Sequence, residues 1–235
     1  MSKKYEFTGE TKEWCGCTLH RIRAVVSFAY IKEGEMGGWI ETESNLSHDG
    51  NAWVSGDASV SGNAEVSGNA RVYGNAWVYG NAEVYGNAWV SGDASVSGNA
   101  EVSGNARVSG NVRVYGNAEV YGNAEVYGNA WVYGNARVSG NARVSGNARV
   151  YGNAEVSGDA SVSGNADYVV FKNCWSSMRW FTYTRSNKKW KVGCFYGTGE
   201  ELIKKAYADS EKSGKCYEAI VRAMETIEAA ITKED

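Results

Sequence analysis

One six-residue unit, Gly-Asn-Ala-x-Val-Tyr/Ser, repeats twenty times from Gly50 to Val169 without an insertion. It occupies 120 of the 235 residues, so a single structural pattern governs half of the chain. Self-similarity at a short fixed period is typical of proteins that stack one small unit on the next. We therefore expect three parts: an N-terminal β cap at 1–49, the repeat region at 50–169 and a C-terminal α+β module at 170–235.

Each unit alternates like a β-strand that has one buried face. Within Ala-x-Val-Tyr/Ser, the Ala and Val point to one side, and the variable residue and the Tyr or Ser point to the other. The Gly-Asn pair between two strands is typical of a corner because both residue types tolerate positive φ. Six residues thus form one side of a coil.

This pattern of one large and one small inward residue per side resembles the left-handed parallel β-helix family of hexapeptide-repeat proteins. The resemblance covers residues 50–169, with Val54 and Val60 at the aliphatic position and Ala58 and Ala64 at the small position. It implies a mainly β fold of three-sided coils, about seven in number, and assembly as a trimer. Because the chain has no proline, nearly every side can donate backbone hydrogen bonds to its neighbours.

The N-terminal flank narrows the resemblance to a group of bacterial and phage β-helix proteins with tandem Gly-Asn-Ala-x-Val repeats. The segments Leu19–Ala24, Gly37–Ile40 and Asn45–Ser47 carry it, and it covers roughly 18–169. It implies a phage or prophage context, and a location in the host cytoplasm if the chain is phage-encoded. The stretch Val192–Glu201 resembles a phage-type β-meander-plus-helix module.

Secondary structure is also expected in both flanks. The stretch Thr18–Glu43 predicts strand, turn and strand leading into the first coil. After the repeat, we expect a three-stranded meander followed by two helices, the first capped by Thr198 and Glu201 and ending near Gly214. The meander strands are Tyr168–Lys172, Trp180–Arg185 and Lys189–Phe195, and the second helix is Cys216–Ile231 with Ile220, Met224, Ile227 and Ile231 on its apolar stripe.

If every third unit lies on the same side, the variable residues form three ladders. The first face carries Trp53, Arg71, Trp89, Arg107, Glu125, Arg143 and Ser161. The second face carries Ser59, Trp77, Ser95, Arg113, Trp131, Arg149 and Asp167. The third face carries Glu65, Glu83, Glu101, Glu119, Arg137 and Glu155. Alternating Trp and Arg on the first face predicts cation–π stacking, whereas the glutamates of the third face repel unless solvent, salt or a basic partner relieves them.

The richest aromatic and cationic surface is predicted on the second face, where a tyrosine ladder runs beside Arg and Trp. Such residues concentrate where partners dock, so this surface, the aromatic-cationic strip, is our candidate binding site. The alternatives are subunit packing, binding of a separate partner or ligand, and plain exposed strand, since Tyr and Trp also favour strands. The strip consists of Arg113, Tyr115, Trp131, Tyr133, Arg149 and Tyr151.

Charge and composition exclude several classes. The net charge of −3 divides into about −2, −4 and +3 for the three parts, so no part is basic enough for strong nucleic-acid binding. No run is long and apolar enough for a signal peptide or a membrane span, and we expect a cytoplasmic protein that does not bind membranes. Five cysteines, an odd number scattered over the flanks, fit free thiols in a reducing compartment.

Candidate reactive residues are few. Cys15, Cys17 and His20, with His48 as a fourth ligand, could bind zinc, but the spacing favours a structural role. Cys194 precedes a predicted helix, where a thiol can be activated, although packing is the simpler interpretation. Acyltransferases of the β-helix family use a histidine base and bind acyl-CoA between subunits. Here both histidines precede the coils, so only His48, at the edge of the first coil, could serve.

These observations favour a non-catalytic, oligomeric β-helix scaffold that presents its faces and terminal modules to a partner. We expect no cofactor and no metal. One alternative is a counter-defence factor that binds a host protein or sequesters a small anionic nucleotide. Another is an acyl-CoA-dependent acyltransferase. A nucleotide-hydrolysing enzyme is not expected, because no Gly-rich loop joins a strand to a helix with the required lysine.

Overall fold

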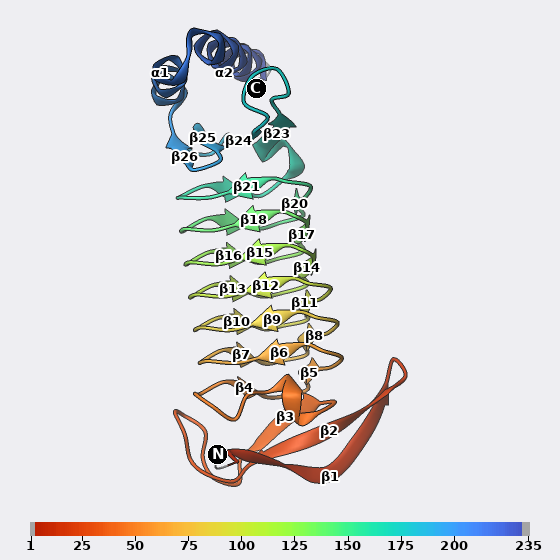
Figure 1. The fold of residues 1–235 in the computed structure, drawn as a ribbon. Coiled ribbons are helices and arrows are strands. Elements are labelled where there is room, and N and C mark those ends of the chain that lie inside the picture. Colours follow the sequence, from red (N-terminus) through yellow and green to blue (C-terminus); the bar gives the residue numbers. More distant parts are fainter. Residues whose placement is uncertain (1–2, 232–235) are drawn as a thin grey trace. The chain divides into compact units, whose positions relative to one another are not determined.

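The computed structural model describes residues 3–231 and divides the chain into two compact units, Met1–Asn165 and Ala166–Asp235. The first unit is a stack of parallel β coils, and the second is a small antiparallel sheet with two helices (Figure 1). The mainly β, parallel β-helix fold is thereby confirmed.

Three parallel sheets form the sides of the helix, and each strand pairs with the strands one coil before and after it. The first face contains β4 (Trp53–Val54), β7 (Arg71–Val72), β10 (Trp89–Val90), β13 (Arg107–Val108), β16 (Glu125–Val126), β19 (Arg143–Val144) and β22 (Ser161–Val162). The second contains β5 (Ser59–Val60), β8 (Trp77–Val78), β11 (Ser95–Val96), β14 (Arg113–Gly116), β17 (Trp131–Gly134) and β20 (Arg149–Val150). The third contains β6 (Glu65–Val66), β9 (Glu83–Val84), β12 (Glu101–Val102), β15 (Glu119–Val120), β18 (Arg137–Val138) and β21 (Glu155–Val156).

The predicted sorting of outward residues into three ladders is confirmed by this register, with one exception. Asp167 was expected to continue the second face, but it lies in the short 3-10 helix η2 (Asn165–Asp167). The reason is in the twentieth unit itself, where Tyr168 replaces the inward Val and begins a strand of the second unit.

Inward Ala and Val side chains fill the centre of the coils. From Ala52 to Val162 these side chains are at most 1% exposed, including Val112, which replaces the usual Ala. Each fully buried Val contributes about 1.5–3 kcal/mol relative to an exposed one. The core is therefore a continuous aliphatic column that a single coil could not form.

The asparagines of the corners act differently from our expectation. Only glycine takes positive φ in the described corners, so Asn is not there for backbone tolerance. Instead, most of these Asn amides donate to the Asn one coil further on, as Asn99 Nδ2 does to Asn117 Oδ1 at 3.0 Å. An aspartate can accept but not donate, so Asp93 accepts from Asn75 at 2.9 Å and ends that run. The corners are thus joined along the stack by side-chain amides.

The N-terminal flank joins the second face. The predicted strand, turn and strand correspond to β2 (Cys17–Ala24) and β3 (Met36–Ile40), while β1 (Tyr5–Trp14) was not predicted. β1 and β2 form an antiparallel hairpin, and β3 pairs in parallel with β5. Figure 1 shows the hairpin at the N-terminal end of the stack.

In the second unit the sheet has four strands rather than the predicted three. They are β23 (Tyr168–Lys172), β24 (Trp180–Thr184), β25 (Lys189–Val192) and β26 (Phe195–Gly197), in that order. The two helices are α1 (Gly199–Asp209) and α2 (Glu211–Ile231). The capping box of Thr198 and Glu201 is confirmed, since the Thr198 side chain accepts from the Glu201 backbone N–H.

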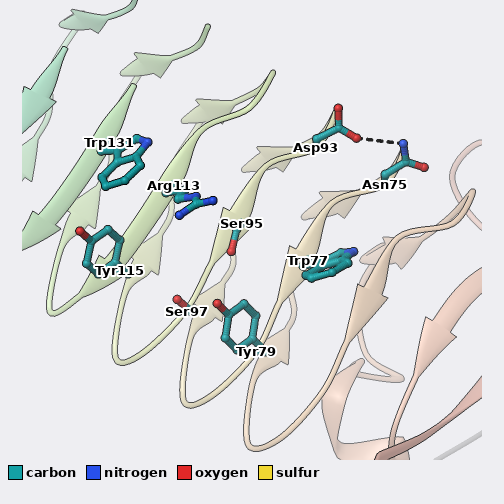
Figure 2. Close-up of a pocket in the computed structure, with 9 residues that line it drawn as sticks. All are labelled: Asn75, Trp77, Tyr79, Asp93, Ser95, Ser97, Arg113, Tyr115 and Trp131. Atoms are coloured by element: carbon teal, nitrogen blue, oxygen red, sulfur yellow. Dashed lines mark hydrogen bonds between the residues drawn. The ribbon is translucent and has the colours of Figure 1, made fainter. Parts of the chain in front are cut away.

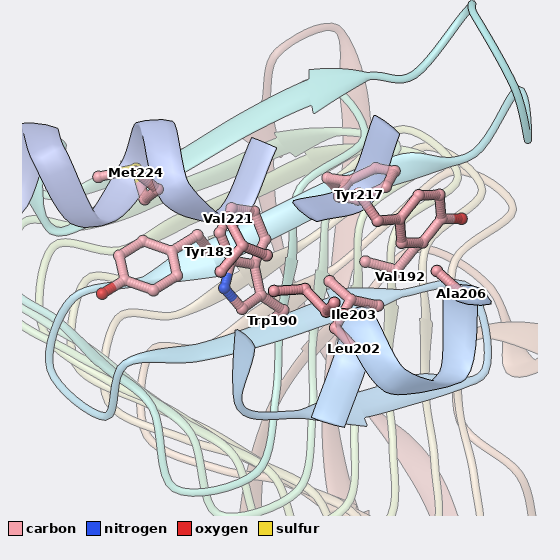
Figure 3. Close-up of a cluster of buried hydrophobic side chains, with 10 residues drawn as sticks. Tyr183, Trp190, Val192, Leu202, Ile203, Ala206, Tyr217, Val221 and Met224 are labelled. Atoms are coloured by element: carbon pink, nitrogen blue, oxygen red, sulfur yellow. The ribbon is translucent and has the colours of Figure 1, made fainter. Parts of the chain in front are cut away.

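The apolar stripe predicted for the last helix was right in its first half and wrong in its second: Met224 is buried and Ile220 packs against the buried cluster. Ile227 and Ile231 are 49% and 38% exposed, and the buried positions of α2 are Gly214, Tyr217, Val221 and Met224. Helix α1 ends at Asp209, with Ser210 as its C-cap, rather than near Gly214. Gly214 lies inside α2 and allows Tyr207 to pack closely, since a Cβ there would lie 2.2 Å from the Tyr207 ring. Figure 3 shows the resulting cluster with Trp190 between sheet and helices.

Candidate functional site

The tyrosine ladder of the aromatic-cationic strip is a continuous stack. Tyr115 and Tyr133 lie with ring centroids 5.0 Å apart and planes inclined by 2°, and Tyr133 and Tyr151 follow at 5.4 Å and 13°. Parallel pairing of β14 with β17 sets this spacing because it places Tyr115 directly beside Tyr133. Tyr151 remains 48% exposed, so the ladder presents aromatic surface to solvent.

Two arginines enclose a tryptophan next to this ladder. The guanidinium carbons of Arg113 and Arg149 each lie 4.9 Å from the Trp131 ring centroid, one coil to either side. Each such contact contributes roughly 0.5–1 kcal/mol at an exposed site. All six residues predicted for the candidate site are therefore adjacent, and neighbouring coils fix their positions.

Burial raises the pKa of the Tyr115 phenol above its usual value, and the neighbouring Tyr133 adds to this effect. The phenol therefore stays neutral and keeps its proton as a hydrogen-bond donor. Arg113 forms no ion pair with any described carboxylate. The strip consequently offers cationic groups and phenolic donors on an aromatic surface, which suits an anionic or aromatic partner.

The strip ends at a depression towards the N-terminal coils. Its volume is about 590 Å³. Figure 2 shows it between Trp77 and Tyr79 on one side and Arg113 and Tyr115 on the other. Sequence reasoning did not find this depression, although the small residue Ser95 in the ladder of the second face was its signal.

The first face carries a second arrangement of the same kind. Arg71 and Arg107 lie 5.3 and 5.1 Å from the Trp89 ring, as the alternation predicted. Trp53 departs from the pattern, because it is only 3% exposed and contacts the rings of Tyr5 and Phe28. The N-terminal segment thus covers the start of this face.

Some glutamates of the third face have interaction partners within the chain. Arg137 donates to Glu119 at 2.9 Å, one coil away. The Tyr85 hydroxyl also donates to Glu101 at 3.1 Å. Glu65 and Glu83 face solvent, which screens their mutual repulsion.

The coils are similar in sequence to a known family of repeats. Several stretches match the family model described as YdcK Beta solenoid repeat, namely 64–80, 76–92, 100–116, 106–122, 130–146, 136–152, 142–158 and 148–164. The chain is a β-solenoid repeat protein. No curated protein matches it. Neither helix within residues 3–231 of this β-solenoid is long and apolar enough to cross a bilayer.

His48, the candidate base of an acyltransferase, lies in the N-terminal cap of the solenoid. Its Nδ1 accepts from the Lys4 backbone N–H at 3.3 Å, and its ring stacks on Tyr5 at 4.3 Å. Burial lowers the pKa of the imidazole, against the opposing effect of Glu43. His48 is thus neutral near pH 7 and packs between cap residues.

Lys4 and Asn45 satisfy the carbonyl groups of the first coil. The Lys4 ammonium, on a residue only 4% exposed, donates to the Ala52 carbonyl at 2.9 Å. Asn45, fully buried, donates to the carbonyls of Gly62 and Ala64 at 2.9 and 2.8 Å. These contacts matter because the first coil has no preceding coil to pair with.

The stability of the solenoid is expected to rise with pH through Lys4. Burial lowers the pKa of Lys4 from 10.5 to about 8. Below about pH 8 both folded and unfolded chains carry this charge; above it the folded chain releases the proton first, so the desolvation cost disappears. Urea unfolding from about pH 7 to about pH 9.5 should show wild type gaining about 1–2 kcal/mol relative to Lys4→Met. A difference that stays constant with pH would contradict the assignment.

The cysteines do not form a metal site with the histidines. Cys15 is exposed, Cys17 donates to the Trp14 carbonyl at 3.0 Å, and the His20 ring stacks on Phe7 at 4.8 Å. Within residues 3–231, no three His, Cys, Asp or Glu side chains lie together as ligands. Cys194 is exposed in the turn between β25 and β26.

Proposed function

We propose that this β-solenoid is a non-catalytic scaffold and binding protein that self-associates, as a trimer, through the aromatic-cationic strip. The resemblance of the repeats and flanks to phage and bacterial proteins supports a phage or prophage accessory role, in the cytoplasm of the host cell. Its faces and terminal modules would be presented to a partner. The hexapeptide repeat runs through the coils without an inserted loop, so the surface is continuous.

The observation that carries this proposal is the continuous stack of the half-buried Tyr115 and Tyr133 and the exposed Tyr151, beside Trp131 between its two arginines. Neighbouring coils hold these side chains in position, so little conformational entropy is lost when a partner covers them. Interfaces are enriched in Tyr, Trp and Arg for this reason among others. The resemblance to trimeric β-helix proteins favours subunit packing as the role of this surface.

A triple variant, Arg113→Ala with Trp131→Ala and Arg149→Ala, is expected to convert the trimer into monomers at micromolar concentration. Loss of central interface residues of this kind typically costs at least about 2 kcal/mol for each strong contributor. Light scattering coupled to size-exclusion chromatography measures the result. The first face supplies a control of identical composition, Arg71→Ala with Trp89→Ala and Arg107→Ala, which should leave the trimer intact. A wild-type monomer, or equal loss in both variants, would exclude the strip as the subunit interface.

Two alternatives have different readouts. A counter-defence factor that binds a host protein through the strip would lose its partner in pull-downs from host lysate with the same triple variant. An acyltransferase would bind acyl-CoA and lose that binding on His48→Ala. A protein that does not bind acyl-CoA at all would eliminate the second alternative.

A further inference from the structure

The second face carries two parallel rows of outward side chains, one from the variable position of each unit and one from the Tyr/Ser position. The depression lies where a coil with serine in both rows stands between two coils with larger side chains. In the inner row Ser95 lies between Trp77 and Arg113, and pairs with both. In the outer row Ser97 lies between Tyr79 and Tyr115, with backbone hydrogen bonds that continue the same register. Figure 2 shows the two serines at the floor and the larger side chains on both sides. We call this gap the Ser95/Ser97 notch.

On both sides of the notch, neighbouring aromatic rings pack against side chains that line it. Trp14 contacts Trp77 with ring centroids 4.4 Å apart, and Trp14 does not line the notch. On the opposite side Trp131 supports Arg113 at 4.9 Å, and Tyr133 supports Tyr115 at 5.0 Å. Trp77, Arg113 and Tyr115 are therefore held in position by neighbouring rings, whereas Tyr79 is 42% exposed.

The width of the notch fits one planar ring. Sides two coils apart are separated by roughly 9.6 Å, twice the spacing of adjacent strands. In the adjoining ladder, rings one coil apart lie at 5.0 and 5.4 Å. A ring at the level of Ser97 would therefore lie at about this distance from both Tyr79 and Tyr115, in the stacked arrangement that aromatic pairs favour.

The polar groups of the notch fit a ring that has an anionic arm and a hydrogen-bonding edge. Arg113 is a cation without a described carboxylate partner, and the Ser95 and Ser97 hydroxyls lie at the floor. Asp93 accepts from Asn75 and retains acceptor capacity towards the notch. A volume of about 590 Å³ exceeds what a single ring fills and lies within the usual range for small-molecule sites.

We propose that the Ser95/Ser97 notch binds a small molecule consisting of a planar heteroaromatic ring with an anionic arm, the chemistry of a nucleoside monophosphate. The ring stacks between Tyr79 and Tyr115, and the anion pairs with Arg113. This inference rests on the binding role proposed for the second face and deepens it by naming a ligand class for one part of that face. Arg113 and Tyr115 belong to both the strip and the notch, so the ligand would lie at the edge of the proposed subunit interface, whereas Tyr133, Arg149 and Tyr151 belong to the strip alone.

The test uses isothermal titration calorimetry of the full-length protein with AMP, adenosine and ribose 5-phosphate. AMP is expected to bind at least tenfold more tightly than either fragment, because it alone provides both the ring and the charge. Ser97→Tyr fills the gap with the residue that the repeat uses in the adjoining coils, and should weaken AMP binding at least about tenfold. Ser109→Tyr is the matched control at the same repeat position on the first face, and should bind AMP as wild type does.

A second variant keeps the test decisive if Ser97→Tyr folds poorly. Arg113→Gln is expected to weaken AMP at least fivefold while leaving adenosine unchanged. The proposal would be overturned if wild type did not bind AMP at millimolar concentration. It would also be overturned if Ser97→Tyr and Ser109→Tyr lost AMP affinity equally, or if wild type bound a short oligodeoxyadenylate more tightly than AMP. Ser97→Tyr retains Arg113, Trp131 and Arg149, so trimer formation reports on the proposed function separately.

Discussion

Replacing Gly104 by alanine is expected to lower the free energy of unfolding by about 2–5 kcal/mol. Gly104 has φ of +67°, and an added Cβ would lie 2.9 Å from the backbone N and O of Gly122 in the next coil. A left-handed backbone costs alanine about 1–2 kcal/mol. Forcing two coils apart adds about 1–3 kcal/mol. Thermal or urea unfolding followed by circular dichroism measures the loss.

Gly152 separates these two contributions. It has nearly the same φ, +68°, but no heavy atom lies within 4 Å of its added Cβ. Gly152→Ala should therefore show only the conformational cost of about 1–2 kcal/mol. Equal effects in the two variants would mean that contact between stacked corners contributes nothing.

The second large effect is expected at the N-terminal cap, where Asn45→Ala should destabilise the protein by roughly 3 kcal/mol. The variant loses two donated hydrogen bonds and the bond that Asn45 Oδ1 accepts from the Thr42 N–H at 2.8 Å, all from a fully buried side chain. It also leaves the carbonyls of Gly62 and Ala64 without these donors. Unpaired strand edges promote association, so aggregation during unfolding should increase.

Asn99→Ala is the matched control, since Asn99 is exposed and its two hydrogen bonds, one accepted from Asn81 and one donated to Asn117, both join exposed side chains. Its expected cost is about 0.5 kcal/mol. Urea unfolding of both variants, with light scattering to follow aggregation, compares the buried cap with an exposed corner. A cost for Asn45→Ala no greater than for Asn99→Ala would show that the cap does not limit stability.

The coils could be predicted because the same two inward residues recur at every side. The resemblance to three-sided coils implies that every third unit pairs, so the order Trp77, Ser95, Arg113 followed from counting units. The strip could be predicted for the same reason. The notch could not be predicted in the same way. It requires small residues at both outward positions of one coil, and it also requires contacts from outside the repeat, such as the contact of Trp14 with Trp77.

The flanks were less predictable because their packing is not repeated. The strand β1 has mixed polar residues and is half solvent-exposed, so it carries little of the alternation that identifies a strand. In α2 the predicted stripe holds at Ile220 and Met224, but Ile227 and Ile231 extend past the residues that form the buried cluster and remain exposed. Where the cluster ends depends on Phe181, Trp190 and Leu202, which lie far from these isoleucines in the sequence.

The corner asparagines restrict changes in the length of the β-solenoid to whole coils. Most of these amides bond to the corner residue one coil away, as Asn99 bonds to Asn117, so an inserted or deleted segment preserves the bonds only when it is a whole coil. Each added coil would lengthen the stack by about 4.8 Å and keep all three faces in line. Residues 53–72 and 89–108 are identical and lie two coils apart. A gene that grows by copying such blocks changes the reach of the protein in discrete steps while its surface chemistry stays in register.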